Sequence, residues 1–134
     1  MTISTFDDLL ATARQQREPQ RLLFVFAAAE LPEGSTPEQA ARFEAGQGGA
    51  LVPQMCVDKT PEEIASFAAL AGEAQQFGQA WKLVFVAALG GRDGLAPSSQ
   101  DADAPLQRMV EDIKRGALEN YIPFNARGEA VSLG

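Results

Sequence analysis

The chain of 134 residues contains no histidine. Without an imidazole it cannot build a Ser-His-Asp or Cys-His catalytic arrangement, and it lacks the commonest zinc ligand. Carboxylates could still hold magnesium or calcium, but no D-x-D-x-D-G loop is present, and Asp101 with Asp103 forms only a short acidic stretch. The sequence therefore favours a protein without a metal, a cofactor or a catalytic centre.

Cysteine and long apolar runs are also scarce. Cys56 is the single cysteine, so no disulfide forms within the chain, which suits a reducing compartment. No apolar run approaches the 18 or more residues of a membrane-spanning helix, and the N-terminal stretch MTISTFDDLL is acidic rather than signal-like. We expect a cytoplasmic protein.

Basic residues are outnumbered, with 11 Lys and Arg against 18 Asp and Glu and a net charge of −7. Affinity for nucleic acids comes mainly from Lys and Arg that displace counterions from phosphates. Anionic membrane surfaces likewise attract basic segments. The charge therefore argues against nucleic-acid and membrane partners.

What the sequence does contain is an ordinary globular core, because 46% of its residues are hydrophobic. A chain of this length buries enough surface to fold as one domain without disulfides or a bound metal. No low-complexity tract or linker divides it. We expect a single globular domain over residues 1–134.

Helix starts are marked by threonines that have a reciprocal acceptor three residues later. These pairs are Thr5 with Asp8, Thr36 with Gln39, and Thr60 with Glu63. A fourth start is expected near Asp103 and Pro105, because Leu106, Met109, Val110 and Ile113 then fall on one helical face. Gly116 is the expected C-cap of that helix.

Strands are indicated by apolar runs between these helices. LLFVFAA (residues 22–28) and LVFVAA (residues 83–88) lack alternation, which is typical of central strands covered on both faces. ALVPQMCV (residues 50–57) and NYIPFN (residues 120–125) contain a proline each, which favours sheet edges. A turn at residues 125–128 leads to a further short strand near Val131 and Leu133.

The order helix, strand, helix, strand occurs twice, and TFDDLL matches TPEEIA while LFVFAAA matches LVFVAAL. We predict an internal repeat of residues 5–58 and 60–125, with strand order 2-1-3-4 about the two apolar strands. The fold class is α/β, with a mixed sheet of four to five strands and about four helices. Parallel crossovers and long antiparallel hairpins both fit the connection lengths, and an α+β two-layer sandwich is the alternative.

Two glycine-rich stretches are candidate ligand sites. Gly46-Gln47-Gly48-Gly49 precedes a strand, which is the wrong context for a phosphate loop. Gly90, Gly91, Arg92 and Asp93 follow a buried strand and lead toward a helix, the usual place for ligands in open α/β sheets. The alternative is that Arg92 and Asp93 are merely solvated turn residues.

Cys56 and three aromatic residues each allow two interpretations. Cys56 could be an exposed redox or nucleophilic thiol activated by nearby Lys59, or a small buried hydrophobe, which we favour. Trp81, Tyr121 and Phe124 would anchor an interface if exposed and belong to the core if buried. The two expected edge strands also make pairing with another chain easy.

The segments FEAGQGGALVPQMCVDKTPEE, APLQRMVEDIKRG and YIPFNARGEAV resemble a family of small bacterial proteins often labelled ribonucleotide reductase subunit alpha. The resemblance covers nearly the whole chain. The catalytic subunit of that enzyme is much longer and uses several cysteines, whereas this sequence offers Cys56 alone. The resemblance therefore implies a coherent family, and we expect the label to be a misannotation that transfers no catalytic residue.

Two functions follow as hypotheses. The first is a non-catalytic interaction module that forms homo-oligomers or binds another protein. The alternative is a sensor or accessory protein for a small molecule or nucleotide, with the ligand near Arg92. It would be linked to ribonucleotide metabolism if the label preserves some truth. An enzyme that uses Cys56 is the least favoured.

Overall fold

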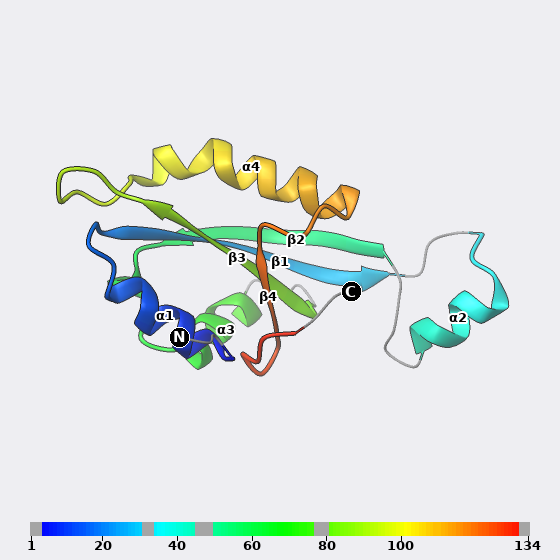
Figure 1. Cartoon of the computed structure of the whole chain (residues 1–134). Coiled ribbons are helices and arrows are strands. Elements are labelled where there is room, and N and C mark those ends of the chain that lie inside the picture. Colours follow the sequence, from blue (N-terminus) through cyan, green and yellow to red (C-terminus); the bar gives the residue numbers. More distant parts are fainter. Residues whose placement is uncertain (1–3, 31–33, 45–49, 77–80, 132–134) are drawn as a thin grey trace.

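The computed structural model describes residues 4–30, 34–44, 50–76 and 81–131. It is an α/β domain with one four-stranded sheet between helices. The elements in chain order are α1 (Phe6–Arg14), β1 (Gln20–Glu30), α2 (Pro37–Glu44), β2 (Ala50–Lys59), the short 3₁₀ helix η1 (Pro61–Glu63), α3 (Phe67–Gln76), β3 (Leu83–Gly90), α4 (Ser99–Arg115) and β4 (Ile122–Asn125). Helices α1 and α3 cover one face of the sheet and α4 covers the other, while α2 lies beyond the ends of β1 and β2 (Figure 1).

The strand order is β2-β1-β3-β4, which confirms the predicted order. All three strand pairs are antiparallel, so the expected mixed sheet is wrong and the antiparallel hairpins that the connection lengths also allowed are present. The reason is visible in the connections. Helix α2 lies beyond the ends of β1 and β2 and not over a face of the sheet (Figure 1), and β1 and β2 pair as the two antiparallel strands of a long hairpin. Before β4 the chain reverses in a turn where Tyr121 N–H donates to the carbonyl of Leu118 at 3.1 Å.

The two apolar strands occupy the centre of the sheet, as predicted, and each is buried on both faces. Alternate residues of β1 and β3 point to opposite sides. Phe24 and Val86 join the cluster beneath α1 and α3, whereas Val25 and Phe85 join the cluster beneath α4. The Phe6 ring lies at the middle of the first cluster, where its centroid is 5.3 to 5.8 Å from three other phenylalanine rings.

The proline-containing strands β2 and β4 lie at the edges, which confirms their placement. The register between β1 and β2 shifts between Phe26 and Ala27, because β2 bulges next to Pro53. After β4, Gly128 N–H donates to the Asn125 carbonyl at 3.0 Å and Val131 N–H donates to the Pro123 carbonyl at 3.1 Å. The expected turn is therefore present, but the described residues after it form isolated bridges, Glu129 with Thr5 and Ala130 with Phe124, and not a fifth strand. Leu133 lies outside the described residues.

Helix starts agree with the sequence in two cases and differ in two. The capping box of Thr5 and Asp8 is formed, and Thr36 and Gln39 exchange the same pair of hydrogen bonds. The Thr60 box instead begins a 3₁₀ turn, because Ile64 is extended and interrupts the helix until Phe67.

The last helix also begins earlier than predicted. Ser98 and Asp101 form a complete capping box, so α4 starts at Ser99 and holds Pro105 within its early turns rather than at its first position. Gly116 is the C-cap as predicted, with φ of 78°. The two halves of the chain place corresponding strands symmetrically about β1 and β3. Because α2 and α4 do not occupy corresponding places, the internal repeat stays a prediction.

Candidate functional site

The candidate site is the part of β3 that β4 does not cover. Strand β3 has 8 residues and β4 has 4, and their register pairs β4 with residues 83–86 alone. Residues 87–90 of β3 pair with β1 on one side. On the other side, β4 begins at Ile122, opposite Val86, and no other described strand pairs with residues 87–90. This end of a central strand therefore has an open edge.

The backbone groups at this open edge belong to Ala88 and Gly90. In an antiparallel ladder, successive residues direct their N–H and C=O groups to opposite sides. Gly91 N–H donates to the Pro19 carbonyl at 2.8 Å, which fixes the odd-numbered residues of this stretch toward β1. Ala88, which lies opposite Leu22, and Gly90 therefore present their N–H and C=O groups away from β1.

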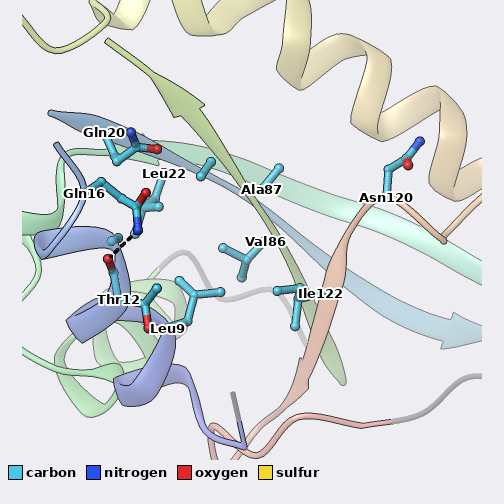
Figure 2. A pocket seen from close by; sticks show the side chains of 11 residues that line it. Leu9, Thr12, Gln16, Gln20, Leu22, Val86, Ala87, Asn120 and Ile122 are labelled. Atoms are coloured by element: carbon cyan, nitrogen blue, oxygen red, sulfur yellow. Dashed lines mark hydrogen bonds between the residues drawn. The ribbon is translucent and has the colours of Figure 1, made fainter. Parts of the chain in front are cut away.

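A groove of about 340 Å³ adjoins the edge, between α1 and β3. Figure 2 shows side chains from α1, β1, β3 and the start of β4 around it. The eleven lining residues are Leu9, Thr12, Ala13, Gln16, Gln20, Leu22, Val86, Ala87, Ala88, Asn120 and Ile122. Aliphatic side chains form most of this lining, and none of the eleven is ionisable.

Polar groups of the groove are neutral and stand at its rim. The Gln16 amide donates to the Thr12 carbonyl at 3.0 Å, drawn as the dashed line in Figure 2, and the Gln20 amide donates to the Glu18 carbonyl at 3.0 Å. Asn120 lies at the other end of the groove from Gln16 and Gln20 (Figure 2). An apolar floor with neutral hydrogen-bonding groups suits binding and offers no acid, base or nucleophile.

The edge is open because the chain before β4 is held against α4. Tyr121 Oη donates to Asp112 Oδ2 at 2.5 Å, and Arg115 also contacts the Asp112 carboxylate. The hydrogen bond from Tyr121 and the contact with Arg115 lower the pKa of Asp112. Burial and the neighbouring carboxylate raise the pKa of Tyr121 to about 12. With Leu118, Tyr121 packs on the α4 cluster, so residues 118–121 leave the β3 edge.

The predicted ligand residues Gly90, Gly91, Arg92 and Asp93 do lie together, around an open pocket of about 540 Å³ that also includes Asp101. Arg92 and Leu95 exchange backbone hydrogen bonds of 3.0 and 2.8 Å around Asp93 and Gly94. Both central residues have positive φ, 51° and 76°, which is the geometry of a type I′ hairpin turn. The turn accounts for Gly94, and ligand binding at this place stays a prediction.

Cys56 is exposed on β2, so the favoured expectation of a buried side chain is wrong. It borders a shallow pocket with α4 residues that include Asp103 and Glu111. Lys59 does not activate the thiol. Lys59 follows Cys56 by three residues on β2, so its side chain points to the opposite face of the sheet. There it pairs with Glu73 of α3 at 2.9 Å.

The three aromatic residues belong to the interior rather than to an exposed surface. Phe124 is fully buried, and half-buried Trp81 stacks edge-on against Phe26 with ring centroids 4.9 Å apart. Tyr121 is half-buried beneath α4. Phe124 therefore belongs to the core, while an interface role for Trp81 and Tyr121 stays a prediction. Gly46, Gln47, Gly48 and Gly49 lie outside the described residues.

Sequence reasoning missed the groove, although it found edges in general. The available signal was the mismatch between the long apolar run from Leu83 and the short run from Ile122. Within the described residues, no three Asp, Glu or Cys side chains gather as a metal site would require, and none of the helices is long and apolar enough to cross a membrane. Comparison with models of known families, with curated proteins and with solved structures finds no match.

Proposed function

We propose that this protein is a non-catalytic interaction module that binds another polypeptide in the groove between α1 and β3. The observation that supports this most is the open edge of β3, whose outward backbone groups adjoin an apolar groove. Exposed strand edges pair readily with other chains, and natural proteins usually protect them. The β2 edge has Pro53 and a bulge as protection, whereas residues 87–90 contain neither proline nor charge.

The chemistry of the groove favours binding over catalysis. General acid–base or nucleophilic catalysis needs a titratable side chain within reach of the substrate. The eleven residues that line the groove supply only aliphatic groups, one hydroxyl and three amides. An enzyme that uses Cys56 gains no support, because the thiol has acidic neighbours and lies across the sheet from Lys59.

A charged side chain placed in the groove tests the proposal. Ala88 is exposed and lines the groove, so Ala88→Arg fills it without disturbing the β1 ladder. Ala68→Arg, at an exposed position of α3, is the control with the same change in charge. A phage-displayed library of random peptides is selected on the immobilised full chain. We expect selected peptides to lose at least tenfold in affinity, about 1.4 kcal/mol, with Ala88→Arg and nothing with Ala68→Arg. Absence of any selected peptide, or equal binding by both variants, contradicts the proposal.

The expected homo-oligomer belongs to the same proposal, since the open edge of one copy can meet that of another. Sedimentation velocity at rising protein concentration measures it directly. An oligomer that Ala88→Arg dissociates would place self-association at this edge. A strictly monomeric protein removes the oligomer from the proposal and leaves peptide binding to be judged by selection.

A second function, small-molecule or nucleotide sensing, is favoured by one observation. Gly90, Gly91, Arg92 and Asp93 line a common pocket, and Arg92 is exposed there. A thermal-shift panel of nucleotides, deoxynucleotides and amino acids tests it. A ligand at a hundredfold excess over its Kd stabilises by about 2.7 kcal/mol. Stabilisation that Arg92→Ala abolishes supports sensing, and no shift with any compound removes it.

A further inference from the structure

The open edge of β3 also indicates how a partner is held and what chemistry it has. We infer, resting on the proposed function, that the ligand is an uncharged, extended segment of a different protein that joins the sheet as a fifth strand along residues 87–90. The segment would occupy the line of β4 beyond Ile122. Its affinity would come from main-chain hydrogen bonds, and its selectivity from one side chain in the groove.

Main-chain complementarity is the first support. Ala88 and Gly90 each direct one N–H donor and one C=O acceptor to the open side, as the Gly91 to Pro19 hydrogen bond and the register of β1 with β3 require. Another extended backbone presents donors and acceptors at this spacing. The four residues 87–90 span about 13 Å, so the added strand is short.

The position of the groove sets the selectivity. Residues directly opposite each other in a ladder place their side chains on the same face. Ala88 shares its face with Val86 and Leu22, on the side of α1. The partner residue opposite Ala88 therefore points into the groove, where Leu9 and Ile122 surround it. Because Ala88 is small and no lining residue is ionisable, the groove selects a large apolar side chain and rejects a charge.

The described chain does not supply this strand itself. Its nearest segment is the turn at residues 118–121, which Tyr121 holds to Asp112 beneath α4. Asn120, which would lie opposite Ala88 if β4 continued, instead stands at the end of the groove. Within the described ranges, no strand therefore lies along Ala88 and Gly90 on this side.

A second copy fits less well than a free segment of another protein. Each copy carries a net charge of −7, so two copies repel each other. Edge-to-edge pairing about a twofold axis perpendicular to the sheet would also bring both α1 helices to the same side of the joined sheet. A free extended segment brings neither the charge nor the helix.

Two variants at one position separate strand addition from side-chain binding. Ala88→Pro removes the outward N–H, and because that group does not bond to β1 the sheet keeps its ladder. Ala88→Ser changes the side chain but keeps the N–H, so it is the comparison variant. The probe is a peptide selected from the random library, measured by titration calorimetry on the full chain. We expect affinity to fall at least tenfold further with Ala88→Pro than with Ala88→Ser.

A measurement on the unaltered protein covers the case in which the proline variant fails to fold. The selected peptide is synthesised with single N-methyl groups at successive positions. Strand addition predicts that binding is lost at alternate positions only, since every second amide faces β3. Loss without alternation, or a selected motif with a charge at the groove position, overturns the inference.

The outcomes distinguish this inference from the function on which it rests. Peptides that Ala88→Arg blocks, but whose N-methyl series shows no alternation, leave the interaction module standing and remove strand addition. Failure of Ala88→Arg to block binding removes both. An oligomer that dissociates with Ala88→Arg would identify a second copy as the occupant and overturn the partner assigned here.

Discussion

Tyr121 donates a hydrogen bond of 2.5 Å to Asp112, and this contact fastens the segment before β4 to the last turns of α4. The chain can follow the edge of β3 only after Tyr121, so β4 covers half of the longer strand. One side-chain contact beneath α4 thereby leaves the backbone groups of Ala88 uncovered at the edge of β3. The ionisation of Tyr121 and Asp112 therefore reports on this contact independently of any binding measurement.

The ionisation of Tyr121 reports this contact, and the chain contains no other tyrosine. We expect its pKa to be about 12, raised from 10 by burial and by Asp112. Because the pKa of Tyr121 is higher in the folded than in the unfolded state, its contribution to the free energy of unfolding is complete below pH 10. That contribution is lost as the pH rises toward 12. Tyrosinate absorbance in a spectrophotometric titration measures it. A midpoint near 10 would show that the contact is absent in solution.

The same contact predicts a loss of stability in acid. The pKa of Asp112 is lowered, first by the hydrogen bond from Tyr121, so its contribution is present above the unfolded pKa of 3.8 and disappears as pH falls through the folded value. Tyr121→Phe should lower the urea midpoint at neutral pH, and the difference from the wild type should shrink as the pH falls below 3.8. An equal difference at neutral and acid pH would mean that Asp112 is not the partner.

Two glycine substitutions should have opposite effects on the free energy of unfolding. A Cβ on Gly91 would lie 2.2 Å from the Leu95 carbonyl oxygen and 2.6 Å from that of Pro19. Because both neighbours are backbone atoms, Gly91→Ala should cost about 1 to 3 kcal/mol. Gly72 lies within α3 with open space around it, so Gly72→Ala should stabilise by about 0.5 to 1 kcal/mol. Urea denaturation checks both, and effects of the same sign would contradict this packing.

Cys56 should react with Ellman's reagent in the native protein, with one equivalent per chain, because the side chain is exposed. Cys56→Ser should change the free energy of unfolding by no more than about 0.5 kcal/mol, as is usual for exposed positions. A thiol that reacts only after urea is added would show that the side chain is buried.

Much of the fold follows from local sequence patterns. The unbroken apolar runs around Phe24 and Phe85 specify central strands, and Pro53 and Pro123 specify edges, which together determine the strand order. Strand direction could not be read from these patterns, since strands covered on both faces look alike in parallel and antiparallel sheets.

Other features depended on competing signals or on distant contacts. Pro105 suggested a helix start, but Ser98 and Asp101 cap the helix further upstream. Thr60 showed a capping pattern that the fold uses for a 3₁₀ turn. The open edge itself depends on where Tyr121 finds its partner, and a contact between a strand entry and a neighbouring helix face has no signature in composition or periodicity.

Amide hydrogen exchange along β3, followed by NMR in the free protein, tests the central claim most directly. The Ala87 and Leu89 amides should be protected, because they face β1, while the Ala88 amide between them should exchange rapidly, because it faces the open edge. Addition of a selected peptide should then slow exchange at Ala88. Protection of Ala88 equal to that of its two neighbours in the free protein would contradict the open edge and the function proposed from it.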